Sequence, residues 1–148
     1  MIPAATVTAW DISAEALEVA KRNGERNEVT VTFEERDLFT QSHIDFPVDI
    51  IVSNPPYIAQ QEEEEMHQNV LKWEPHTALF VPNHDPLRFY RKIAILAFAA
   101  LQSGGELYFE INQAYGKETL QLLEEIGYST TELRKDLFGK DRMIKATR

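Results

Sequence analysis

The chain has 148 residues, of which 43% are hydrophobic and 10% aromatic, a composition that supports one packed domain and argues against intrinsic disorder. Lys and Arg number 15 against 24 Asp and Glu, and the resulting net charge of −9 disfavours duplex nucleic acid as a partner. Cysteine is absent, which excludes disulfides and thiolate chemistry, and no apolar run approaches the ~20 residues of a membrane span. Because the N-terminus also has no signal-peptide pattern, we expect a cytoplasmic protein without a membrane partner.

The N-terminal part of the chain alternates strand and helix patterns. Three segments have the β-branched or continuous apolar composition of strands: 6–11, 29–33 and 49–53. Between the first two, Ser13 is a good N-cap, and Asn23-Gly24 predicts the end of a helix. The segment 49–53 is apolar almost throughout, which is typical of a strand covered on both faces.

The C-terminal part predicts a long loop followed by alternating helices and strands. Residues 54–84 have no strong periodicity, and a segment of this length is usually a lid or a recognition loop. Asp85-Pro86 predicts a helix with Asp85 as its N-cap, ending at Gly104-Gly105. The remaining predicted elements are a strand at 106–111, a helix at 116–126 stopped by Gly127, and two strands at 129–133 and 142–146.

This order of elements predicts an α/β fold with a mostly parallel sheet and an antiparallel final hairpin. We expect residues 1–148 to form a single domain. In open sheets of this kind the ligand binds beyond the carboxyl ends of the strands. Asp11, Asp37 and Asn54 all fall at such ends, so they are the candidate site residues.

The strongest motif is Asn54-Pro55-Pro56-Tyr57, directly after the apolar strand. Two consecutive prolines restrict two φ angles and remove two N–H donors, so the backbone is stiff and its carbonyl oxygens remain available as acceptors. An amide side chain and an aromatic ring stand beside them. This corner suits an –NH2 group held against a flat face, although Asn and Pro are also common in simple turns.

The tetrapeptide resembles the catalytic motif of S-adenosylmethionine-dependent methyltransferases that act on exocyclic or amide nitrogens. With its wider context, the segments 50–58, 73–79, 109–111 and 127–128, it is similar to the HemK/PrmC family of peptide-chain release factor glutamine methyltransferases. The resemblance extends over essentially the whole chain. It implies a Rossmann-like class I methyltransferase fold, the cofactor S-adenosyl-L-methionine and a release factor as the protein substrate.

The resemblance also implies roles for individual residues. Asp11, with Ile12 beside it, matches the acidic residue that binds the ribose hydroxyls, and a carboxylate suits a diol because it accepts two protons. Asp37 matches the acceptor of the adenine amino group, with Leu38 as an apolar neighbour of the ring. The substrate glutamine amide is expected to bind these residues: Asn54, Pro55, Pro56, Tyr57 and Glu74. Of these, the resemblance implies catalytic roles for Asn54, which also lies at the cofactor, and for Pro55 and Tyr57.

Simpler roles exist for several of these residues. Asp11 would also stabilise a helix N-terminus through the helix dipole, and Asp37 would also fit a solvated loop. The acidic run 62–65 is typical of an exposed face. The four histidines lack metal-ligand spacing, so we expect no metal.

One departure from the family concerns the cofactor loop. No two of the six glycines form a G-x-G pattern, and the chain starts near the family's second strand. We therefore expect a truncated catalytic domain that lacks the first, central strand, the glycine loop and the first helix. Unpaired backbone groups cannot stay buried, so the flanking strands would pair directly, another chain would fill the gap, or the chain is a piece of a longer protein. Alone, it is expected to bind S-adenosylmethionine weakly and to have little activity.

Four functions remain open from the sequence. The first is release factor glutamine methylation, and the second is methylation of a glutamine in a ribosomal protein. The third is methylation of an adenine amino group in DNA or RNA, where the same corner would hold a flipped base. The acidic charge counts against it. The fourth is a non-enzymatic remnant that keeps the fold without the cofactor loop.

Overall fold

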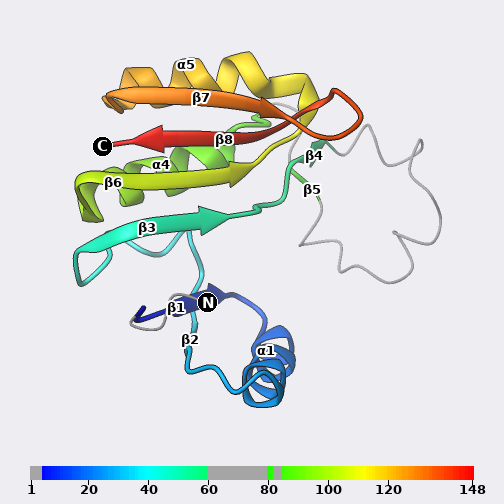
Figure 1. The fold of residues 1–148 in the computed structure, drawn as a ribbon, viewed down its shortest axis with the longest axis vertical. Coiled ribbons are helices and arrows are strands. Elements are labelled where there is room, and N and C mark those ends of the chain that lie inside the picture. Colours follow the sequence, from blue (N-terminus) through cyan, green and yellow to red (C-terminus); the bar gives the residue numbers. More distant parts are fainter. Residues whose placement is uncertain (1–4, 60–79, 82–84) are drawn as a thin grey trace. The chain divides into compact units, whose positions relative to one another are not determined.

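The computed structural model describes residues 5–59, 80–81 and 85–148, and the chain divides into two compact units, Met1–Ser42 and His43–Arg148 (Figure 1). None of the helices in these ranges is long and apolar enough to cross a membrane. The assignment of residues 1–148 to one catalytic domain stays a prediction.

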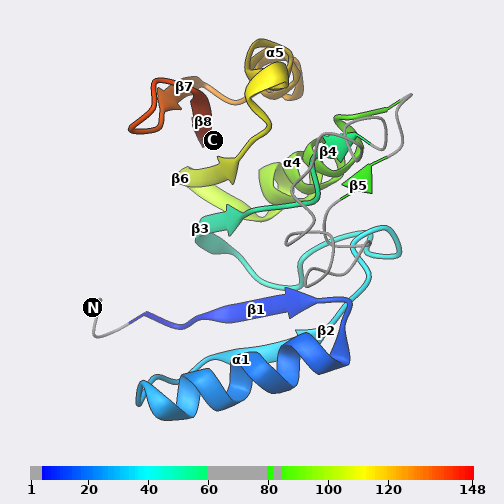
Figure 2. The same ribbon diagram turned by 90° about the vertical axis from the view of Figure 1, so that its right-hand side faces the viewer.

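The first unit is a βαβ element. Strand β1 (Thr8–Asp11) runs parallel to β2 (Thr32–Glu35), and helix α1 (Ala14–Arg26) connects them. Figure 2 shows α1 lying along the strand pair. The strands are in register from Thr8 opposite Thr32 to Asp11 opposite Glu35, so both end at the same edge.

Helix α1 begins as predicted and ends later than predicted. The Ser13 hydroxyl accepts a hydrogen bond from the Ala16 N–H at 3.2 Å, which confirms Ser13 as the N-cap. The predicted end at Asn23-Gly24 is wrong, because the helix continues to Arg26. Gly24 is buried inside it, where a Cβ atom would lie 3.8 Å from the Phe33 ring of β2. This is an ordinary van der Waals distance, so Gly24 lies inside a packed part of the helix and does not end it.

The second unit is built on a mixed four-stranded sheet. Its strand order is β3 (Val48–Ser53), β6 (Leu101–Glu110), β8 (Asp141–Thr147) and β7 (Thr130–Lys135). The pair β3 and β6 is parallel, whereas β8 runs antiparallel to both β6 and β7. The short strands β4 (Ile58–Ala59) and β5 (Phe80–Val81) form a separate parallel pair. The predicted α/β class with an antiparallel C-terminal hairpin is confirmed.

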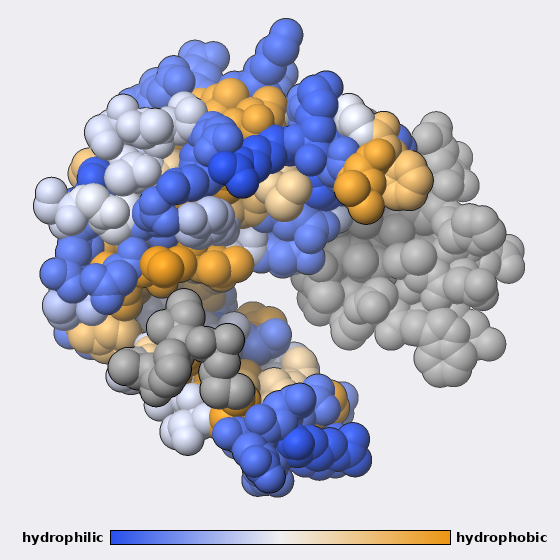
Figure 3. Space-filling view, viewed as in Figure 1, coloured by the Kyte–Doolittle hydropathy of each residue, from blue (hydrophilic) through white to orange (hydrophobic). Residues whose placement is uncertain are grey.

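Helices α4 (Arg88–Ala100) and α5 (Gly116–Ile126) cover one face of this sheet (Figure 2), and the 3-10 turn η2 (Gln113–Tyr115) leads into α5. The core lies between the helices and the sheet. Its buried residues are Tyr90, Ala94, Ala97, Leu101, Leu107, Phe109, Ile111, Leu123, Tyr128, Ile144 and Ala146. Figure 3 shows the other face, where polar residues cover the centre and a hydrophobic strip follows β3.

The strip over β3 corrects one prediction. Ile50 and Val52 are 53% and 75% exposed, whereas Val48 and Ile51 pack against the core. The apolar run is therefore not covered on both faces within the described residues of the second unit, because α4 and α5 cover only one face of its sheet (Figure 2); β3 is also the edge strand of that sheet. Which of the three expected routes satisfies this edge stays a prediction.

Both predicted ends of the second helix are wrong. Helix α4 starts at Arg88 after Leu87, while the Asp85 carboxylate pairs with the Arg91 guanidinium at 3.0 Å instead of capping the helix. At the other end, β6 follows α4 directly at Leu101. The two glycines lie inside β6, where Gly104 has a φ of +80° and the register with β3 shifts. They mark a bulge, a common place for glycine in a strand.

Gly127 ends α5 as predicted and offers a test of backbone strain. Its φ is +114°, and a Cβ atom there would lie 3.3 Å from the Phe98 ring. We expect Gly127→Ala to lower the free energy of unfolding by more than the about 1–2 kcal/mol that left-handed backbone alone costs. Gly139→Ala is the matched control, because its φ is +77° but nothing lies within 4 Å of the added Cβ. The additional loss at Gly127 would come from the close approach of the new methyl group to the Phe98 ring. If urea titrations give equal losses of unfolding free energy for the two variants, this close approach does not matter.

Candidate functional site

In the first unit, the two candidate cofactor-binding aspartates lie at one edge. The Arg36 N–H donates to the Asp11 carbonyl oxygen at 2.9 Å, which extends the parallel ladder by one step beyond β2. Asp37 is the next residue. The structure thus places Asp11 and Asp37 at the carboxyl ends of neighbouring parallel strands, where ligands of open α/β sheets bind.

Local hydrogen bonds orient each of these carboxylates. One oxygen of Asp11 accepts from the Ser13 N–H at 2.8 Å, and one oxygen of Asp37 accepts from the Phe39 N–H at 2.8 Å. The alternative role of Asp11 at the helix N-terminus is therefore present in the structure. It does not compete with ligand binding, because a carboxylate has two oxygens and several lone-pair sites.

Arg36, which the sequence analysis did not identify as a site residue, holds the backbone next to Asp37. Its guanidinium lies 4.7 Å from the centre of the Trp10 ring. It also donates to the Glu34 carboxylate at 2.6 Å and to the Gln41 amide oxygen at 3.0 Å. Stacking and charge-assisted bonds together hold the backbone on both sides of Asp37 in one conformation.

In the second unit, the Asn54-Pro55-Pro56-Tyr57 corner directly follows β3. Asn54 is exposed, Pro55 is buried, and Pro56 and Tyr57 are half-buried. The corner thus has an exposed asparagine followed by a proline that is buried in the protein. That this corner offers the Asn54 amide to a ligand stays a prediction.

Tyr57 joins the corner to the end of the neighbouring strand. Its hydroxyl donates to the Glu110 carboxylate at 3.0 Å, and its carbonyl oxygen accepts from the Asn112 amide at 3.1 Å. Burial and the hydrogen bond to Glu110 raise the pKa of Tyr57, so the phenol stays protonated and keeps donating at neutral pH. The Glu110 carboxylate therefore holds the Tyr57 ring by its hydroxyl, and the Asn112 amide holds the Tyr57 backbone.

The sequence reasoning did not single out Glu110 or Asn112 as site residues. Glu110 is the last residue of β6, and Asn112 follows two residues later. Because β3 and β6 are parallel, with Ser53 opposite Phe109, their carboxyl ends meet at the same edge as the corner. The signal that could have found them is polar residues at the end of the next predicted strand, 106–111.

Not every predicted site residue lies within the described part of the chain. Ile12 is 61% exposed beside Asp11, and Leu38 is half-buried beside Asp37. Glu74 lies outside the described residues. The assignments to cofactor and substrate remain predictions for all of these residues.

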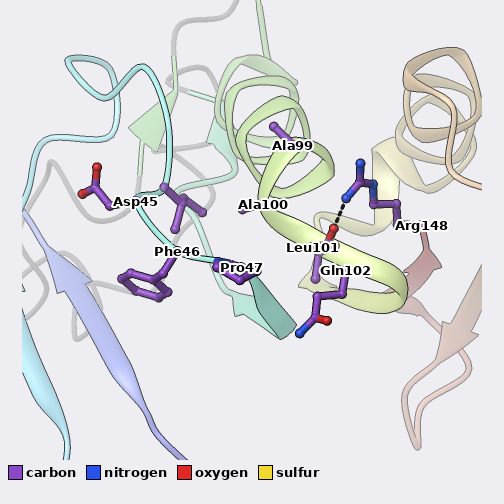
Figure 4. A pocket seen from close by; sticks show the side chains of 9 residues that line it. Asp45, Phe46, Pro47, Ala99, Ala100, Leu101, Gln102 and Arg148 are labelled. Atoms are coloured by element: carbon purple, nitrogen blue, oxygen red, sulfur yellow. Dashed lines mark hydrogen bonds between the residues drawn. The ribbon is translucent and has the colours of Figure 1, made fainter.

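A pocket of about 390 Å³ lies at the opposite edge of the four-stranded sheet (Figure 4). It is lined by the segment that precedes β3, the end of α4 and the start of β6, together with Arg148. Arg148 donates to the Leu101 carbonyl oxygen there. Since this edge holds the amino ends of β3 and β6, the pocket is separate from the corner and we assign it no function.

The chain is similar to two bacterial proteins named release factor glutamine methyltransferase. The protein from Bacteroides thetaiotaomicron is 52% identical over 148 residues, 99% of this chain and 53% of its own length. The protein from Flavobacterium psychrophilum is 51% identical over 144 residues, 97% of this chain and 50% of its own length. The chain therefore spans about half the length of the curated relatives it matches.

A solved structure supports the fold, and a family model identifies the family. The crystal structure of a methyltransferase from Pyrococcus furiosus matches with a TM-score of 0.67 at 20% identity, over 96% of this chain and 62% of that one. At this identity the match confirms the fold, an α/β fold of the class I methyltransferase type. The chain matches the methyltransferase small domain model over residues 1–77 of its 148 residues, and it therefore belongs to that family.

Proposed function

We propose that this chain provides catalytic residues for methyl transfer from S-adenosyl-L-methionine to the side-chain amide nitrogen of a glutamine. The proposed substrate is the glutamine of the Gly-Gly-Gln motif of peptide-chain release factors, in the cytoplasm. The observation on which the proposal depends is the corner at the end of β3, which exposes the Asn54 amide above a buried Pro55 and a braced Tyr57. The names of the two relatives support the choice of substrate.

The chemistry of the substrate explains why such a corner is needed. An amide nitrogen is a poor nucleophile because its lone pair is delocalised into the carbonyl group. The Asn54 side-chain oxygen and the Pro55 carbonyl oxygen would accept its two N–H bonds, which orients the nitrogen and favours the form with an available lone pair. Tyr57 would pack against the flat amide. As the N–methyl bond forms and the sulfonium–methyl bond breaks, the leaving group would be a neutral thioether and the nitrogen would lose one N–H proton to water.

The residues at the edge of the first unit fit the cofactor. Asp11 and Asp37 place two carboxylates at the ends of adjacent parallel strands, suited to a ribose diol and an exocyclic amino group. The exposed Ile12 and the half-buried Leu38 add apolar surface for the adenine ring. When bound, S-adenosylmethionine supplies an electrophilic methyl group on a sulfonium.

Two alternatives to the release factor glutamine are a glutamine of a ribosomal protein and an adenine amino group of DNA or RNA. A ribosomal-protein glutamine would use the same chemistry, whereas an adenine amino group would need a basic surface to bind nucleic acid. The net charge of −9 disfavours the latter. If the chain is instead a non-enzymatic remnant that keeps only the fold, none of the three substrates will be methylated.

The test is a methylation assay in two protein forms. The first form is this chain alone, which we expect to show little activity. The second, called the chimera below, joins this chain to the part of the Bacteroides thetaiotaomicron relative that it does not cover. Each is incubated with S-adenosylmethionine and a release factor, a ribosomal protein fraction or an adenine-containing oligonucleotide. Mass spectrometry then locates any added methyl group.

We expect the chimera to methylate the Gly-Gly-Gln glutamine of the release factor. A release factor variant with Gln→Glu in this motif is the matched control, because it lacks the amide nitrogen. Methylation of the oligonucleotide or of a ribosomal protein instead would overturn the choice of substrate. No transfer to any of the three would overturn the enzymatic proposal.

A further inference from the structure

We infer that Asn112 is a positioning residue for the Asn54-Pro55-Pro56-Tyr57 corner, holding Tyr57 by its backbone so that the Asn54 amide keeps one orientation. The inference rests on the proposed function, since it gives the corner its role. It adds to the site a residue on a different strand end, far from the corner in sequence. The contact that carries it is the hydrogen bond from the Asn112 side-chain amide to the Tyr57 carbonyl oxygen, at 3.1 Å.

The surroundings of Asn112 define which end of its side chain donates. It is only 6% exposed, and its side-chain oxygen accepts from the Ala114 N–H at 2.9 Å, which caps η2. With its oxygen used in this way, the –NH2 group faces the Tyr57 carbonyl. A buried amide with both ends paired has one favoured orientation, because reversing it would break both bonds.

A second anchor connects Asn112 to the core. The Tyr90 hydroxyl lies 3.3 Å from the Asn112 backbone nitrogen, which donates to it, and itself donates to the Glu110 carbonyl oxygen at 3.3 Å. Tyr90 is fully buried in the core on α4. The backbone on both sides of Ile111 is therefore tied to the helix layer, and Asn112 transmits this rigidity to the corner.

The hydroxyl of Tyr57 cannot replace this contact. The Glu110 carboxylate fixes the outer end of the ring, which limits rotation of the side chain. The bond from Asn112 instead fixes the backbone, and the backbone determines where the Pro55 carbonyl and Asn54 lie. Active sites in general need residues that contact the substrate to be held rigidly by hydrogen bonds from neighbouring residues.

Asn112→Asp separates this role from a structural one. The introduced carboxylate keeps the size of the side chain and the acceptor for the Ala114 N–H, since Asp and Asn cap equally well. It loses the donor to the Tyr57 carbonyl oxygen. Asn23→Asp, at an exposed position on α1, is the control for the same change of charge.

The first measurement does not depend on activity. Backbone amide order parameters of Asn54 and Tyr57 are measured by NMR relaxation in this chain and in both variants. We expect values near the rigid limit of about 0.85 in the parent and Asn23→Asp, and a clear drop toward about 0.6 in Asn112→Asp. Unchanged order parameters in a folded Asn112→Asp variant would overturn the inference, whether or not methyl transfer is detected.

The second measurement uses kinetics of the chimera. We expect Asn112→Asp to lower kcat about 10–100-fold while the KM for S-adenosylmethionine stays within about twofold. The loss should shrink as the pH falls, because a protonated carboxyl group can again donate to the Tyr57 carbonyl. A loss that is independent of pH, or one confined to KM, would contradict positioning. An inactive parent would contradict the proposed function, and the NMR result would still decide the role of Asn112.

Discussion

Asn54→Ala is expected to reduce kcat of the chimera by about 10²–10³-fold, the effect of removing one acceptor or donor aimed at a reacting group. Affinity for S-adenosylmethionine should change far less, because the aspartates Asp11 and Asp37 are left intact. The fold should also be unaffected, since Asn54 is exposed. Single-turnover methylation of the release factor and calorimetric titration of the cofactor measure the two quantities separately.

The control for Asn54→Ala is Asn27→Ala, which removes another exposed asparagine side chain at the end of α1. It should leave kcat unchanged and at most slightly lower the melting temperature. Near-normal turnover of Asn54→Ala would refute the proposed role of the corner. A loss of turnover accompanied by an equal loss of cofactor affinity would point to a binding role instead.

Phe109→Ala should give the largest loss of stability. Phe109 is 2% exposed in β6, and its ring packs edge-to-face on Tyr90 with the ring centres 5.2 Å apart. Truncating a buried phenylalanine leaves a cavity and costs about 3–5 kcal/mol. We expect the urea midpoint of the unit formed by residues 43–148 to fall accordingly.

Phe138→Ala is the matched control for this prediction, because the Phe138 side chain is 88% exposed in the turn between β7 and β8. Its removal should change the free energy of unfolding by less than about 0.5 kcal/mol. Similar losses in the two variants would show that the contact between Phe109 and Tyr90 does not stabilise the core.

Local patterns predicted the elements that depend on neighbouring residues. The Ser13 cap and the Gly127 stop are determined by side-chain and backbone preferences over one helical turn, and both are confirmed. The same rules failed at Gly24 and at Gly104-Gly105. Helix α1 continues past Gly24 to Arg26, and Gly104-Gly105 lie where the register of β3 against β6 shifts; contacts between distant segments leave no local signal.

In the candidate site, too, local patterns predicted some residues, and contacts between distant segments determined the others. Asp11, Asp37 and the Asn54-Pro55-Pro56-Tyr57 corner could be identified because each follows a predicted strand, and ligands of open sheets bind at such ends. Glu110 and Asn112 also lie at the end of a predicted strand, but their contacts with Tyr57 could not be identified, because these depend on β3 and β6 being parallel neighbours. Predicting the strands did not predict their side-by-side register in atomic detail.

The amino-acid sequence by itself determined the α/β class, the stiff corner after β3 and the acidic ends of β1 and β2, since propensity, proline geometry and strand periodicity act over a few residues. Only the tertiary structure decided that Tyr57 is held from β6, that Tyr90 of α4 ties this strand end to the core, and that β3 is an edge strand of its sheet. The physical reason is that hydrogen bonds between residues more than 50 positions apart form only when the packing of helices on the sheet brings their strands together.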